Sequence, residues 1–67
     1  MKLIDTGPNN ADIDCVTAWA SELYAHKCIT SAQRSNAIAT IRYAVATQDR
    51  MLKTAVIEML DAADDLI

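Results

Sequence analysis

One stretch of the chain carries the side chains best suited to metal binding or thiol chemistry. Cys15, Trp19, Glu22 and His26 lie within about 60° of one another on a helical wheel, and Cys28 follows two residues later. A thiolate, a carboxylate and an imidazole can hold zinc or activate a thiol. The spacing Cys-x10-His-x-Cys matches no zinc pattern, however, and His26 is eleven positions beyond Cys15, which is roughly 16 Å along a helix axis. We therefore expect a half-buried helix edge with a Glu22–His26 pair, and no metal, cofactor or catalytic site.

Acidic side chains gather at the C-terminal end of the sequence. They occupy four of eight positions, at Glu58, Asp61, Asp64 and Asp65. A helix dipole disfavours negative charge at this end, and Asp61 and Asp65 form a repulsive i,i+4 pair. Two interpretations stay open, a solvated helix end and an acidic ridge that docks on the basic surface of a protein partner. The second places these four acids among the predicted partner-binding residues.

A second candidate surface contains the only aromatic residue after Tyr24. Asn36, Tyr43, Thr47 and Arg50 stack on one helix face at steps of seven, four and three. Tyr and Arg are enriched where proteins meet. Ile57 lies off the apolar stripe of the helix, which runs through Leu52, Val56 and Leu60, so we expect it to be exposed in a lone bundle. Tyr43, Arg50 and Ile57 are therefore predicted partner contacts, although the Tyr43 ring could instead cover neighbouring alanines.

Basic residues raise the alternative of a DNA-binding regulator with a helix-turn-helix. Gln33, Arg34 and Asn36 near the start of a predicted helix could read base edges. However, Arg34, Arg42 and Arg50 turn round the helix by about 80° each, so they form no single stripe. The net charge of −3 also opposes phosphate binding, which depends on cations. Nucleic-acid binding is therefore the less favoured interpretation.

The composition predicts the fold class. Twelve alanines, no Phe, one Gly and one Pro are typical of an all-α protein. At 67 residues the chain is a single domain that leaves much of its surface uncovered, so a second copy would help to bury it and we predict a homodimer. No apolar run approaches 18 residues and no signal peptide is visible, which predicts a cytoplasmic protein without a membrane span. Cys15 and Cys28 are then expected as buried, reduced thiols.

Capping residues mark where the helices should begin. Gly7 and Pro8 form a turn, and Asn9 or Asn10 can cap the helix that follows. Thr30 with Gln33 three residues later fits a capping box. The predicted segments are a lead-in at 1–8 and helices at about 11–27, 31–47 and 49–65.

Whether the last two helices are separate is open from the sequence. No Gly or Pro stands between Val45 and Leu52, but Thr47 or Asp49 could cap a new helix. An i,i+4 pair of Asp49 with Lys53 is compatible with either case. A break predicts a three-helix bundle, which we prefer, whereas a continuous helix of about 35 residues predicts a helical hairpin that needs a dimer partner. The expected core comprises Ile13, Val16, Ala20, Leu23, Tyr24, Ile38, Ile41, Val45, Leu52, Val56, Leu60 and Ala63, with Trp19 at one edge.

The leading functional hypothesis is a non-enzymatic helical interaction protein, an inhibitor or regulator that occupies a surface of a larger partner. In its small size, mild acidity and lack of catalytic signatures, the chain resembles small accessory proteins of bacteriophages and other mobile elements. That resemblance rests on general character and assigns no residue a role. The alternative is a dimeric helix-turn-helix regulator.

Overall fold

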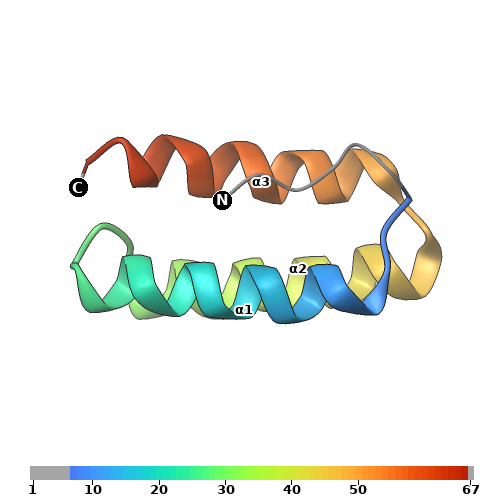
Figure 1. Ribbon diagram of the computed structural model, residues 1–67, viewed down its shortest axis with the longest axis horizontal. Coiled ribbons are helices and arrows are strands. Elements are labelled where there is room, and N and C mark those ends of the chain that lie inside the picture. The colour runs from blue at the N-terminus through green and yellow to red at the C-terminus, as the bar shows by residue number, and fades with distance from the viewer. Residues whose placement is uncertain (1–6, 67) are drawn as a thin grey trace.

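A computed structural model describes residues 7–66, which form an antiparallel three-helix bundle (Figure 1). Helix α1 spans Asn10–Ala25, α2 spans Ser31–Thr47 and α3 spans Arg50–Asp64. The prediction of an all-α three-helix bundle is therefore confirmed, and the predicted helix limits differ from these by at most two residues. Of the predicted lead-in, residues 1–6 lie outside the described part of the chain.

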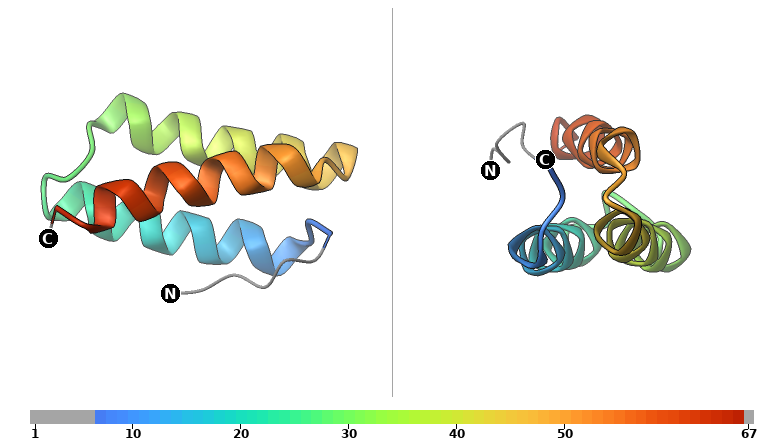
Figure 2. Two further views of the ribbon diagram at one scale, coloured as in Figure 1. Left: turned by 90° about the horizontal axis from the view of Figure 1, so that it is seen from above. Right: turned by 90° about the vertical axis from the view of Figure 1, so that its right-hand side faces the viewer.

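Viewed end-on, the helices stand at the corners of a triangle (Figure 2). Because α1 and α3 run in the same direction, the α1–α2 turn lies at the end of the bundle where α3 finishes, and the α2–α3 turn lies where α1 begins. The radius of gyration is 10.8 Å, close to the roughly 10.9 Å expected of a compact domain of this length. The accessible surface is 4335 Å², against about 4,200 Å² for a monomeric protein of this mass.

Helices α1 and α2 each begin with a capping box, in which two residues exchange a pair of hydrogen bonds. The Asn9 side chain accepts from the Asp12 N–H at 3.2 Å, and the Asp12 carboxylate accepts from the Asn9 N–H at 3.0 Å. Thr30 and Gln33 make the equivalent exchange at 3.1 and 2.8 Å at the start of α2. These bonds satisfy backbone donors that a helix start leaves without partners.

The chain does break between Thr47 and Arg50. Gln48 adopts a left-handed backbone conformation with φ of 56°, and the Asp49 N–H returns to the Ala44 carbonyl at 2.9 Å. Asp49 then caps α3, because its side chain accepts from the N–H groups of Met51 and Leu52. Many helices end in this way, with one residue in the left-handed conformation and a following backbone N–H that bonds to a carbonyl of the last turn. Glycine is the residue that usually takes the left-handed position.

Lys27 makes the same kind of stop after α1. Its φ is 60°, and the Cys28 N–H reaches back to the Leu23 carbonyl at 2.9 Å. A side chain in this conformation costs about 1–2 kcal/mol relative to glycine. Both helix ends are thus set by local backbone geometry that neither Gly nor Pro marks in the sequence.

The core is rotated slightly from the predicted stripe. Trp19 is 5% exposed and belongs to the core, not to its edge, whereas Tyr24 is 45% exposed and was wrongly assigned to it. Ile13, Ile38, Val45 and Leu52 are half-buried. Alanines occupy part of the core that was expected to be filled by larger side chains, because helices that pack closely bury the alanines that face the neighbouring helix. The buried apolar residues are Val16, Trp19, Ala20, Leu23, Ile29, Ala37, Ile41, Ala44, Val56, Leu60 and Ala63.

A buried ion pair joins α1 to α3. Lys53 Nζ lies 3.0 Å from Asp12 Oδ2, and the two side chains are 3% and 8% exposed. The predicted pairing of Lys53 with Asp49 is therefore replaced by one across the bundle, since Asp49 is occupied in capping α3. The same Asp12 oxygen accepts the Asn9 N–H, so the cap of α1 and the α1–α3 contact share one carboxylate.

The side chain of Gln48 links the α2–α3 turn to the segment before α1. Its side-chain amide donates to the Pro8 carbonyl at 3.0 Å and to the Val45 carbonyl at 2.9 Å. Residues forty positions apart are thus joined, and the segment before α1 is held against the α2–α3 turn.

Candidate interaction surface

The predicted acidic ridge is exposed on the last two turns of α3 and just beyond. Its members, hereafter the acidic end, are Glu58, Asp61, Asp64 and Asp65. Within residues 7–66, no cation lies at ion-pair distance from any of them. α3 also ends without a basic residue in its last turn, so nothing described there offsets the unfavourable dipole.

Tyr43 and Arg50 lie near the other end of the bundle. Tyr43 is 62% exposed on α2 and Arg50 is exposed at the start of α3. Asp61 is eleven positions beyond Arg50, which is about 16 Å along α3. The structure therefore divides the predicted partner residues between two places, one near the α2–α3 turn and the other at the C-terminal end of α3.

Ile57 is half-buried and packs against the core. The expectation that it would be exposed in a lone bundle is wrong, because α3 turns this residue toward the bundle beside Val56 and Leu60. Its side chain therefore packs against the core whether or not a partner binds.

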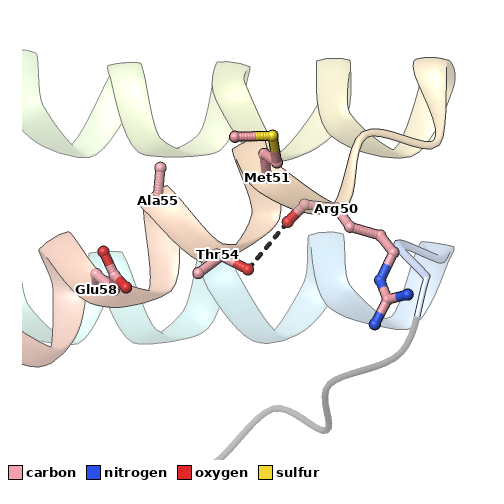
Figure 3. Close-up of a pocket in the computed structure, with 5 residues that line it drawn as sticks. All are labelled: Arg50, Met51, Thr54, Ala55 and Glu58. Carbon is pink, nitrogen blue, oxygen red and sulfur yellow. Dashed lines mark hydrogen bonds between the residues drawn. The ribbon is translucent and has the colours of Figure 1, made fainter.

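Met51 is the most exposed large apolar side chain in the described chain, at 83%, and the sequence interpretation did not single it out. It lines a depression of about 350 Å³ on the outer face of α3, together with Thr54 and Ala55. Figure 3 shows Arg50 and Glu58 at the two ends of this depression, and the Thr54 hydroxyl donating to the Arg50 carbonyl at 3.0 Å. The sequence does contain a pattern that indicates this surface. A second line of apolar residues on α3, at steps of four, four and three, comprises Met51, Ala55, Met59 and Ala62.

The thiol and imidazole residues do not converge. Cys15 and Cys28 are free and half-buried, and His26 is exposed just after α1. The Cys28 thiol approaches the His26 carbonyl oxygen at 3.7 Å, not its ring. Across the described part of the chain, no group of three His, Cys, Asp or Glu side chains is placed to hold a metal ion.

Arg34 is engaged inside the fold. Its guanidinium lies 5.3 Å from the centre of the Tyr24 ring and donates to the Ser21 hydroxyl at 3.4 Å. Gln33, the neighbouring candidate for base reading, caps Thr30 with its side chain. In addition, α1 and α2 pack antiparallel (Figures 1 and 2), whereas a helix-turn-helix sets its helices at about 90–120°.

Between residues 7 and 66, no helix has both the length and the apolar character that crossing a membrane requires.

Comparisons of the chain with protein-family models, with curated proteins and with solved structures found no match.

Proposed function

We propose that this chain is a non-enzymatic helical interaction module, an inhibitor or regulator that binds a larger protein through the acidic end and Tyr43. The observation that carries this proposal is the contrast between the carboxylates the fold uses and those it does not. Asp12 is paired with Lys53 and Asp49 caps α3, whereas the acidic end is exposed without a cation in the described chain.

The acidic end is also costly to the isolated bundle. Charges opposed to a helix dipole each cost about 0.3–1 kcal/mol, and like-charge i,i+4 pairs add a few tenths more. A basic partner surface would convert this unfavourable term into attraction and would accelerate association. Surface charges that reduce stability are typical of binding sites.

The test is a reversal of two of these charges. Asp61→Lys together with Asp65→Lys should keep the helical circular dichroism, raise the free energy of unfolding by about 1 kcal/mol through the helix dipole, and weaken partner binding. The partner is first identified by affinity capture from the source cell and mass spectrometry, and the purified pair is then titrated. We expect a loss in affinity of at least about tenfold.

The matched control is Asp14→Lys with Glu22→Lys on the exposed side of α1. It changes the net charge by the same amount and should leave the affinity nearly unchanged. Equal losses from both double variants would show that net charge, not the position of the acidic end, controls binding, and unchanged affinity in the Asp61/Asp65 variant would remove the acidic end from the site.

Self-association and a cytoplasmic location are also part of this proposal. The free thiols of Cys15 and Cys28 suit a reducing compartment. The exposed side chains of Tyr43 and Met51 favour contact with a second copy of the chain. Compactness does not require that contact, because the radius of gyration of the single chain is already that of a compact domain. Sedimentation equilibrium over a hundredfold concentration range tests the dimer directly, since a single mass of 7.3 kDa would exclude it.

A further inference from the structure

A hollow of about 430 Å³ lies at the α1–α2 turn. Its apolar lining comes from Tyr24, Ala25, Cys28 and Ile29. Lys27 is the only charged residue that lines it, and this residue is exposed. A group that fills the hollow must therefore supply apolar atoms and, beside them, negative charge.

The other polar side chains of the lining are already paired. Thr30 and Gln33 also line the hollow, and they exchange the two hydrogen bonds of the capping box of α2. Lys27, by contrast, lies at ion-pair distance from no carboxylate within residues 7–66. What remains for a ligand is apolar surface next to one ammonium group, which suits an aliphatic side chain flanked by carboxylates.

The end of α3 presents that combination of groups. Leu66 follows the helix and is 72% exposed, and its N–H bonds to the Ala63 carbonyl at 3.0 Å, which fixes its place beyond the last turn. Asp64 and Asp65 directly precede it and are exposed. An aliphatic side chain therefore stands beside two carboxylates, and nothing between residues 7 and 66 covers it.

The hollow and Leu66 belong to the same end of the bundle, because α3 finishes where the α1–α2 turn lies (Figures 1 and 2). Since Leu66 is exposed, it does not fill the hollow of its own chain. A two-fold axis that passes between the two features of one end exchanges them in a second copy. Each copy would then offer its Leu66 to the hollow of the other, which makes a closed, self-complementary contact.

We propose that the hollow at the α1–α2 turn binds Leu66 of a second copy of this chain in a two-fold dimer. Asp64 and Asp65 of that copy then lie beside Lys27. The inference rests on the self-association included in the proposed function and names the surface that carries it. The bundle is about 20 by 17 Å across its end, so the contact falls below the roughly 1,200 Å² of total buried area at which stable complexes begin. The dimer is therefore weak, with a dissociation constant of about 100 μM.

The first test is sedimentation equilibrium between about 10 μM and 1 mM protein. Leu66→Ser should raise the dissociation constant of the dimer at least about tenfold, and the circular dichroism should stay helical because the side chain is exposed. Met51→Ser is the matched control, since Met51 is even more exposed, at 83%, but lies on the outer face of α3. It should leave the dissociation constant unchanged.

The charges are tested by exchanging them. Lys27→Glu and Asp65→Lys should each raise the dissociation constant at least about threefold, and the double variant should return it to within about twofold of the original value. Added salt should weaken the unaltered dimer, because the paired charges lie at the surface. A single mass of 7.3 kDa at every concentration, an unchanged constant in Leu66→Ser, or an equal loss in Met51→Ser would each overturn the inference.

A cross-link tests the contact directly, because Cys28 lines the hollow. Oxidation of Leu66→Cys by diamide should join the new thiol to Cys28 of the second copy. The covalent dimer should appear on a non-reducing gel, persist with Cys15→Ser and vanish with Cys28→Ser. Absence of the cross-link, or a dimer that survives Cys28→Ser, would contradict the proposed contact. A disulfide within one chain would also do so, because the hollow would then receive the end of its own chain.

The two proposals share Asp64 and Asp65 but can fail separately. If Leu66→Ser leaves the dimer intact while the Asp61/Asp65 reversal releases the identified partner, this inference fails and the proposed function stands. If Leu66→Ser dissociates the dimer but the Asp61/Asp65 reversal leaves the partner bound, this inference stands and the acidic end loses its proposed role in binding a larger protein.

Discussion

The buried pair of Asp12 and Lys53 offers the sharpest test of how this small bundle is held together. Its two side chains are 8% and 3% exposed, with 3.0 Å between Oδ2 and Nζ. Removing one member of a buried pair leaves the other charge without compensation, at a cost of about 3–5 kcal/mol. A chain of this length has a total stability of roughly 3–10 kcal/mol, so the loss would be a large share of the total.

The perturbation is a double-mutant cycle of Asp12→Asn and Lys53→Met. In Asp12→Asn the amide oxygen of the new side chain can still accept the Asn9 N–H, so this change removes charge and spares the cap of α1. Lys53→Met keeps most of the apolar stem of the side chain and should cost about 3–5 kcal/mol, because it leaves a buried carboxylate. Asp12→Asn should cost about 2–3 kcal/mol, because a neutral oxygen still faces the ammonium.

The double variant should be more stable than the sum of the single effects implies, with a coupling energy of at least about 2 kcal/mol. Urea unfolding followed by circular dichroism measures each corner, and with a slope near 1 kcal/mol per molar urea a loss of about 3 kcal/mol moves the midpoint by about 3 M. If a single variant does not fold, refolding in the double variant demonstrates the coupling directly. Additive losses below about 1 kcal/mol would refute the reasoning, since the pair would then behave as a solvated one, and Asp14→Asn on the exposed side of α1 should change stability by less than about 0.5 kcal/mol.

Two further predictions concern the helix ends and the corrected position of Ile57. Lys27→Gly should raise the free energy of unfolding by about 0.5–1 kcal/mol by relieving a left-handed backbone. Gln48→Gly relieves the same backbone conformation but loses the two hydrogen bonds of the side-chain amide, so the free energy of unfolding should fall by about 1 kcal/mol. If urea unfolding instead shows equal gains in stability for both glycine variants, the hydrogen bond to Pro8 contributes nothing. Ile57→Ala should cost about 1–2 kcal/mol because the side chain packs on the core, whereas Leu66→Ala, at a residue that is 72% exposed, should cost under about 0.5 kcal/mol in the same thermal or urea assay. A neutral Ile57→Ala would restore Ile57 to the list of surface contacts.

The candidate surface was foreseen in part. The exposure of the acids and of Tyr43 follows from their place off the apolar stripe, which a helical wheel displays. The wheel misplaced Ile57 and overlooked Met51, because the side of a helix that faces the core depends on how its neighbours lie against it. The depression of about 190 Å³ between α2 and α3 could not be read from one helix at a time, since residues of both helices line it.

The sequence by itself determined the all-α class and, within two residues, where helices can begin, but it left open whether the chain breaks between α2 and α3. That information is local: Asn9, Thr30 and Asp49 satisfy the first N–H groups of each helix by contacts within three residues of the cap. Only the tertiary structure decided that Lys53 faces Asp12 and that Gln48 reaches Pro8. Such pairings join residues about forty positions apart, and their energies depend on burial and on the orientation of whole helices, which no short stretch of sequence contains.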